Sequence, residues 1–418
     1  MNNLPHQFQR RVESLRMRIE TLSSLRNLVA LPPAHDISSR QWVVIESELK
    51  AVEARLLRRL KRGARAHLPQ ANSPQVAAIL NALLGEIEME MSRVFTFFDT
   101  YMDVLTQRHP AELGLLLAGC DVLAWDGINR DHPALAIVEM PLVYCDRGFG
   151  ASTLREGVRL PGHGFNPIPL VQIPYSRLKE KYNLTSILHE VGHEAMVRLG
   201  LVRALPKVLR SALSRAGASK SIQDLFALWS FEIGPDFWTF CASGIAEAGA
   251  IKEILALPPV HAFRIAWADP HPPPYLRSLL SFEWCRQVWG AGVWDRWEKE
   301  WLELYPLKDA PLETRDILKR AAVYLPVIAR ALLRTGFRVL NQKTIPDLFN
   351  LSALAPSELQ RIVDNAKDGS LELKGLPPSA HLAVFRLIKD QGRLNEEKID
   401  RVMTAWLLKL AARKKNLQ

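Results

Sequence analysis

The chain has 418 residues, of which 48% are hydrophobic and 23% are charged, and its formal net charge is +10. This composition is ordinary for a globular protein, so it excludes a wholly disordered chain and predicts a sizeable core. The four cysteines lie far apart and form no CxxC pair, which excludes a dense disulfide framework and favours a reducing compartment.

The amino-terminal segment carries no targeting feature. Residues 1–11 are polar and charged, and they lack the apolar stretch of a signal peptide. No uncharged apolar run reaches the roughly 18 residues that a transmembrane helix needs. We therefore expect a soluble, cytoplasmic protein.

Over the first quarter of the chain, apolar residues recur at intervals of three and four, the spacing of a helix with one buried face. Three helices are expected, at about 7–28, 38–62 and 73–106. Residues 1–110 are therefore predicted to form a helical bundle or hairpin.

A run of cations lies on the second of these helices: Arg55, Arg58, Arg59, Lys61, Arg62 and Arg65. Leucines are interleaved with the cations, so the segment is amphipathic. Two interpretations stay open: a solvated face of a core helix, or a weak contact surface for a polyanion such as nucleic acid or an acidic membrane. The cations have no aromatic residues among them, which argues against base stacking.

After Pro110 the pattern changes. Short apolar runs at 115–123, 134–144 and 168–173 are separated by glycine and proline residues. Runs of this length with such punctuation predict a small sheet with loops.

From about Tyr182 helical periodicity returns and continues to the end of the chain. Five tryptophans between residues 284 and 301 are expected to pack in the core or between helices. The predicted fold class is α+β and mostly helical. Residues 111–300 would form the core of the molecule, and residues 301–418 a carboxy-terminal helical region.

The pentapeptide His189-Glu190-Val191-Gly192-His193 lies in one of these predicted helices. Histidines four residues apart leave the same face of a helix one turn apart, so both imidazoles can bind a single Zn²⁺. Glu190 lies beside that face, where it can accept a proton from a metal-bound water and pass it to the leaving group. The pattern predicts a zinc-dependent hydrolase, and a peptidase in particular.

A catalytic zinc site needs a third protein ligand, and no histidine follows His193 closely enough to supply it. We expect Glu232, on the next helix, to be that ligand, with Glu247 as the alternative. Asp236 follows Glu232 by one turn and can accept the second N–H of a ligating histidine. Pro235 between them predicts a kink or a helix end.

The segment from His271 to Arg277 offers donors for the negative charge of a tetrahedral intermediate. His271, Tyr275 and Arg277 are the candidates. The alternative interpretation is a rigid proline-rich turn with exposed polar residues.

Together these motifs resemble the gluzincin class of zinc metallopeptidases, and most of all the HtpX and CAAX prenyl endopeptidase group. In that group HExxH is followed by an ExxAD helix and then by a segment of the form HPxxxxR. This chain has Glu232 and Asp236 at the first spacing, and His271-Pro272 with Arg277 at the second. The resemblance covers about residues 115–280.

The resemblance implies a zincin-like core in which His189, His193 and Glu232 bind zinc and Glu190 is the general base. Asp236 would then support a ligand, while His271 and Arg277 would stabilise the intermediate. The run Pro167–Pro174 would be an edge strand that pairs with an extended peptide substrate.

Two other classes of function stay open. The chain can be a helical scaffold or binding protein in which zinc is structural or vestigial, although structural zinc sites usually have four protein ligands and often cysteine. It can also be a basic polyanion-binding protein that acts through residues 55–65.

Overall fold

The computed structural model describes residues 4–29, 31–33, 35–136, 139–148, 150–159, 165–364, 373, 375–414 and 417. The chain divides into two compact units. Unit 1 comprises Met1–Ala118, Leu154–Leu170 and Lys414–Gln418, and unit 2 comprises Gly119–Thr153 and Val171–Arg413.

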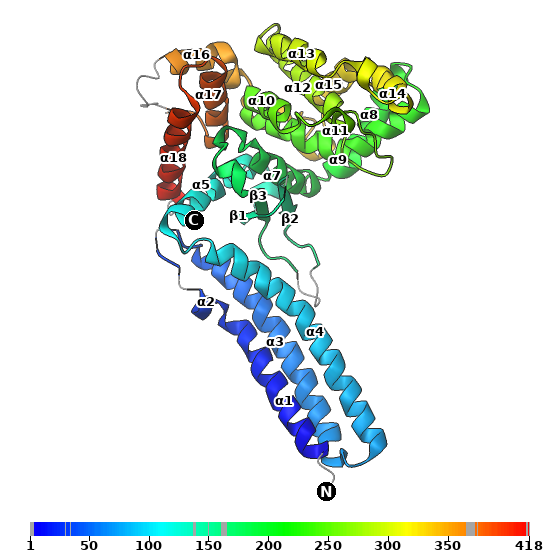
Figure 1. Cartoon of the computed structure of the whole chain (residues 1–418), viewed down its shortest axis with the longest axis vertical. Coiled ribbons are helices and arrows are strands. Elements are labelled where there is room, and N and C mark those ends of the chain that lie inside the picture. Colours follow the sequence, from blue (N-terminus) through cyan, green and yellow to red (C-terminus); the bar gives the residue numbers. More distant parts are fainter. Residues whose placement is uncertain are drawn as a thin grey trace. The chain divides into compact units, whose positions relative to one another are not determined.

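Three long helices that pack side by side form most of unit 1 (Figure 1): α1 (Leu4–Glu20), α3 (Ser39–His67) and α4 (Pro74–Thr106). The short α2 (Leu25–Leu28) follows α1. Ser38 starts α3 with a capping box, in which its side chain and that of Gln41 each accept a backbone N–H of the other residue. The second and third predicted helices are therefore present, and α3 extends beyond the predicted end to His67. The first, predicted at 7–28, ends at Glu20 as α1 and continues as a 3-10 turn (Thr21–Ser24) and the short α2.

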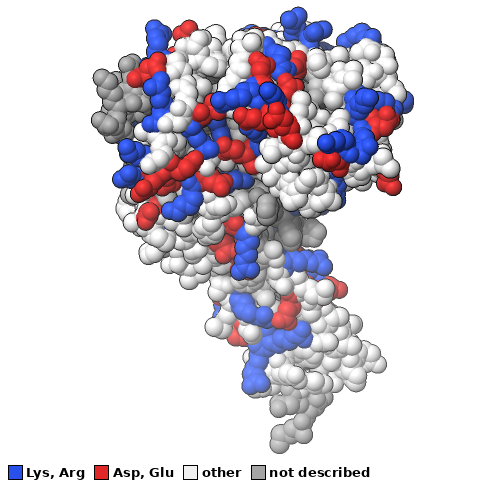
Figure 2. Space-filling view, turned by 45° about the horizontal axis from the view of Figure 1, so that its top comes forward, with Lys and Arg blue, Asp and Glu red and all other residues white. Residues whose placement is uncertain are grey.

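The cations of α3 fall into two sets. Arg55 and Arg59 pair with Glu90 on α4 at 3.0 and 2.8 Å. The others, at i, i+3, i+4 and i+7, are exposed and form no ion pair with the described residues: Arg58, Lys61, Arg62 and Arg65. On the face of the molecule in Figure 2, basic and acidic side chains are interspersed, so the net charge of +10 is not gathered into one broad patch there.

Unit 2 holds nearly all the remaining helices, and α5 (Ala111–Ile128) crosses from unit 1 into it. The others are α6 (Pro133–Ala136), α7 (Thr185–Arg198), α8 (Leu201–Arg215), α9 (Lys220–Ser243), α10 (Ile245–Ile254), α11 (Pro259–Ala262), α12 (Pro274–Trp289), α13 (Val293–Leu304), α14 (Leu312–Ala322), α15 (Leu325–Arg334), α16 (Pro356–Asp364), α17 (Pro378–Asp390) and α18 (Glu396–Arg413). The predicted class, α+β and mostly helical, is confirmed.

The predicted small sheet is present, although only two of the three predicted apolar runs contribute strands to it. Its strands in the described residues are β1 (Leu142–Asp146), β2 (Ser152–Leu154) and β3 (Leu170–Pro174), in the order β1-β3-β2. The apolar run 115–123, predicted as sheet, is instead part of α5. This stretch of the helix is buried on nearly all sides, so its sequence lacks the alternation of apolar and polar residues that would indicate a helix. The run 134–144 begins in α6 and ends in β1, while its residues 137 and 138 lie outside the described residues.

The expected edge strand at Pro167–Pro174 is also wrong in its position. Its strand portion, β3, lies in the middle of the sheet, because β1 pairs with one side of β3 and β2 with the other. A substrate strand could therefore add only to β1 or β2.

Helix α9 is the centre of unit 2 and packs against both α7 and α8. From Trp229 to Ile251, Phe231 is the one exposed residue. Pro235 neither ends α9 nor starts a new helix. The carbonyl that loses its hydrogen-bond partner at this proline belongs to Phe231, where the helix meets solvent.

The tryptophans near α12 and α13 pack in the core, as predicted. The buried ones are Trp284, Trp294, Trp297 and Trp301. None of the helices in the described part of the chain is both long and apolar enough to cross a membrane.

Candidate metal centre

The candidate site lies where α7 and α9 pack closely against each other. Glycine makes this approach feasible, because a Cβ atom added to Gly192 would lie only 3.1 Å from the Cα atom of Pro235. A Cβ atom on Gly234 would lie 2.8 Å from Leu205 Cδ1 and 3.3 Å from Met196 Sδ. The two helices run antiparallel here, since His189 contacts Asp236 while His193, one turn later, faces Glu232.

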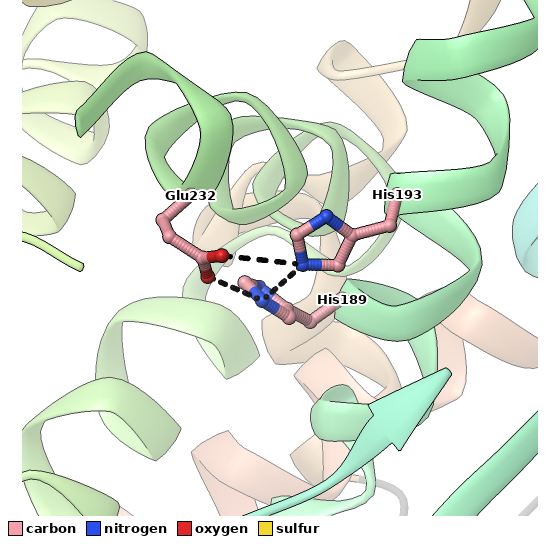
Figure 3. Close-up of side chains that lie close together, drawn as sticks. All are labelled: His189, His193 and Glu232. Carbon is pink, nitrogen blue, oxygen red and sulfur yellow. Dashed lines mark hydrogen bonds and ion pairs between the residues drawn. The ribbon is translucent and has the colours of Figure 1, made fainter. Parts of the chain in front are cut away.

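Two imidazoles from α7 and one carboxylate from α9 point toward one another (Figure 3). Nε2 of His189 lies 3.2 Å from Nε2 of His193 and 3.3 Å from Oε2 of Glu232. Nε2 of His193 lies 3.7 Å from Oε1 of Glu232. These three residues form a group whose donor atoms all lie within 4.8 Å of one another, so they can hold a metal ion.

Glu247, the alternative third ligand, does not belong to this group. It is not a surface charge either, because α10 buries it to 3% exposure. Burial raises the pKa of Glu247 well above its ordinary value, and the nearby charge of Asp236 adds to that effect. A carboxyl group that stays protonated is a poor metal ligand, so Glu232 is the acid that the structure brings to the histidines.

Asp236 links a ligand, His189, to a cation, Arg277. Its Oδ1 accepts the Nδ1–H of His189 at 2.8 Å, and both of its oxygens accept hydrogen bonds from Arg277 at 2.7 Å. Burial opposes ionisation of Asp236, but the Arg277 guanidinium and His189 outweigh burial and hold the pKa of this carboxyl well below its ordinary value. The charge on Asp236 in turn fixes the orientation of the His189 ring, as predicted from the spacing.

The two histidines differ in their affinity for protons. Burial alone would lower the pKa of His189, but the hydrogen bonds to Asp236 and Glu232 raise it well above its ordinary value. Burial and the neighbouring His189 lower the pKa of His193 to about 4. Without a metal, His189 therefore holds a proton at neutral pH while His193 stays neutral.

Glu190 is buried next to this charged group. Burial raises its pKa to about 7, and the charge of Glu232 contributes in the same direction. A carboxyl group whose pKa lies close to neutral pH can both accept and return a proton there.

His271 reaches the same place from the segment before α12. Its Nε2 lies 3.5 Å from Glu232 Oε2, and its ring is 56% exposed. Asp269 holds the other side of the ring, with 2.6 Å between Asp269 Oδ1 and His271 Nδ1. This end of the segment is therefore part of the site and not only a turn on the surface.

The structure gives the other two candidates in this segment different surroundings. Tyr275 is buried against Phe263, with ring centroids 5.4 Å apart, so it belongs to the core. Arg277 is partly exposed, at 14% of its side chain, and directs its guanidinium at Asp236.

Two features of the site were not predicted. Asp269 was not among the predicted site residues. Asp side chains commonly accept a hydrogen bond from the backbone N–H two residues later, and Asp269 accepts the N–H of His271 in this way. Arg277 and Asp236, which form an ion pair, are 41 residues apart in the sequence, so no short sequence motif indicates that they pair.

We compared the chain with known proteins. No family model, no curated protein and no solved structure matches it.

Proposed function

We propose that this protein is a zinc-dependent peptidase. The observation that carries the proposal is the convergence of His189, His193 and Glu232, with the buried Glu190, whose pKa is raised to about 7, near them. Two imidazoles and one carboxylate are the donor set of many catalytic zinc sites, which keep a position open for water or substrate.

The spacing of the donors fits zinc. Ligand atoms at about 2.1 Å from a tetrahedral zinc ion lie about 3.4 Å from one another. In this site the two histidine Nε2 atoms lie 3.2 Å apart. The Glu232 carboxylate presents a different oxygen to each ring, with Oε2 at 3.3 Å from His189 Nε2 and Oε1 at 3.7 Å from His193 Nε2. Little rearrangement of the side chains would therefore be needed for binding.

The number of donors favours a catalytic site over a structural one. The group holds three residues and no cysteine, and the four cysteines are buried outside it. A structural zinc site would be expected to have four protein ligands. The scaffold alternative is therefore the weaker proposal.

Each residue near the group has a role that follows from its position. When bound, Zn²⁺ would act as a Lewis acid toward water and the scissile carbonyl. Glu190 would take the proton of the attacking water and pass it to the departing amine. His271, whose ring is held in place by Asp269, would donate a hydrogen bond to the developing oxyanion. Arg277 would act at one remove, by keeping Asp236 ionised.

The test compares the parent protein with Glu190→Gln, loaded with zinc, on a library of random peptides. We expect the variant to bind zinc as the parent does, because Glu190 is not among the three donors. We expect it to hydrolyse peptides at least about a hundred times more slowly, the loss typical for a general base. Full activity in Glu190→Gln would contradict the mechanism.

A contact with polyanions is a second and separate proposal. It is favoured by the four exposed cations of α3, which lie at i, i+3, i+4 and i+7: Arg58, Lys61, Arg62 and Arg65. Binding of heparin would be measured over a salt series for the parent and for Arg58→Glu/Arg62→Glu. Removing two cationic contacts should make the slope of log K against log salt shallower by about two. Equal slopes would contradict the proposal.

A further inference from the structure

A second group of charged residues in unit 2 surrounds a cavity of about 270 Å³. The cavity lies between α10, α13 and α17, and α10 contacts both of the other helices (Figure 1). Seven of the described residues that line it are charged, four of them cations and three of them acids. None of the lining residues belongs to the metal group, so the cavity is a separate feature of unit 2.

The cavity has a buried floor and an exposed rim. Arg386 and Trp297 are 2% and 4% exposed, whereas the side chains of Arg296 and Glu300 are 56% and 43% exposed. Gly249 leaves room for the floor, because a Cβ atom at this position would lie 2.6 Å from Cδ of Arg386. A small molecule can therefore enter from the rim and reach the charged floor.

The charges around the cavity are held in place by the three helices. One ion pair joins each two of these helices: Lys389–Glu253 between α17 and α10, Arg296–Asp390 between α13 and α17, and Lys252–Glu300 between α10 and α13. Because the pairs form a closed ring, a ligand would meet an arrangement of charges that is already formed.

Two carboxylates of this ring keep an oxygen for a further donor. Oε1 of Glu253 lies 2.8 Å from Arg386 and 2.9 Å from Lys389, and Oδ1 of Asp390 accepts hydrogen bonds from two side chains of α13. Within the described residues, Oε2 of Glu253 and Oδ2 of Asp390 accept none. Burial would raise the pKa of Glu253, but the charges of Arg386 and Lys389 hold it below its ordinary value. Both oxygens can therefore receive the N–H groups of a cation.

Two ammonium groups of the ring keep hydrogens for a further acceptor. Among the described residues, Lys252 donates one hydrogen bond, to Glu300, and Lys389 donates one, to Glu253. An ammonium group has three N–H donors, so each lysine has two that remain. Each of α10 and α17 thus supplies one cation and one acid with bonding capacity to spare, and the cavity suits a ligand that carries both signs of charge.

We propose that this cavity binds a free amino acid, with its carboxylate at Lys252 and Lys389 and its ammonium group at Glu253 and Asp390. A ligand with only one sign of charge would lie against side chains of the same sign, and a phosphate dianion would lie among three carboxylates. The volume of about 270 Å³ is just below the range of pockets for drug-sized ligands, so the ligand is small. The proposal does not depend on the peptidase function.

The first experiment varies the ligand. Calorimetry measures the binding of each common amino acid to the metal-free protein, because an amino acid would also chelate zinc. The tightest binder is then compared with its analogue that lacks the amino group and its analogue that lacks the carboxylate. We expect each analogue to bind at least about tenfold more weakly, since each leaves charged groups of the cavity without a partner. Equal binding of an analogue, or no binding of any amino acid at millimolar concentrations, would overturn the proposal.

The second experiment varies the protein. Asp390→Asn keeps an oxygen for the two donors of α13 but removes the charge, and Lys252→Gln removes a cation. We expect each variant to bind the same amino acid about tenfold more weakly. Asp224→Asn and Lys220→Gln are the matched controls, because these residues pair with each other on α9, outside the cavity, and they should bind as the parent does. Equal affinities in all four variants would contradict a site in this cavity, and the comparison of analogues on the parent decides the proposal if a variant does not fold.

Discussion

Asp236 contacts the ligand His189 on one side and the guanidinium of Arg277 on the other, and its negative charge interacts with both. Asp236→Asn keeps the shape of the side chain but removes the charge that orients and polarises His189. We expect zinc affinity, measured by calorimetry, to fall about 10- to 100-fold, the usual cost of losing such a partner. Asp224→Asn is the matched control, because Asp224 lies on the same helix but pairs at the surface. Equal affinities in the two variants would contradict this role.

The proton on His189 predicts how zinc binding depends on pH. Because the pKa of His189 is raised and zinc binds the neutral ring, the ion must displace a proton at neutral pH. Apparent affinity should therefore fall as the pH falls, by about tenfold per pH unit below the pKa of His189, and level off above it. His193, with a pKa of about 4, adds nothing to this dependence near pH 7. Calorimetry in two buffers of different ionisation enthalpy should detect about one released proton, and no release would contradict the prediction.

At the residue scale, the sequence predicted the site residues whose relative positions are set within a single helix. The spacing of His189 and His193 is fixed by the pitch of one helix, and Glu232 and Asp236 are likewise one turn apart. The choice between Glu232 and Glu247 could not be made in this way, because it depends on how α9 and α10 pack. Burial of Glu247 became visible only in the structure.

At the scale of elements, the close approach of α7 and α9 depends on a helical glycine. Gly192→Ala would place a methyl group 3.1 Å from the backbone of Pro235, so the helices must move apart and the donors with them. We expect a loss of stability of about 1–3 kcal/mol and weaker zinc binding.

Gly85→Ala is the control, since a Cβ atom at Gly85 in α4 meets nothing within 4 Å. There the same substitution should stabilise the protein by up to about 1 kcal/mol, through helix propensity alone. Urea unfolding and zinc titration of both variants would check this pair. Two changes in the same direction would contradict the account of the α7–α9 contact.

The two wrong predictions, for residues 115–123 and for the position of β3, both concern properties that depend on tertiary structure. The run 115–123 is apolar on almost every position because α5 is buried nearly all round, and such a run has no periodicity that distinguishes helix from strand. The central position of β3 depends on β2, which has only three residues, none of them buried, so no alternation marks it in the sequence. Pairing partners of a strand are a tertiary property that its own sequence does not carry.

At the scale of the whole molecule, the donors all belong to unit 2, while α1, α3 and α4 belong to unit 1. If zinc binds only the folded site, a free zinc concentration of a hundred times the dissociation constant would stabilise that site by about 2.7 kcal/mol. We expect zinc to slow hydrogen exchange in α7 and α9 and to leave exchange in α1, α3 and α4 unchanged. Slowing of equal size in both sets would contradict a single metal centre in unit 2.

The central claim is that zinc held by His189, His193 and Glu232 makes this protein a peptidase. The most direct measurement is a titration of the metal-free protein with zinc, in which bound metal and hydrolysis of a peptide library are followed together. The account predicts that hydrolysis rises with bound zinc and saturates at one ion per chain, while Glu190→Gln binds the ion and stays inactive. Hydrolysis that proceeds without metal, or zinc binding that survives the double variant His189→Ala/His193→Ala, would contradict it.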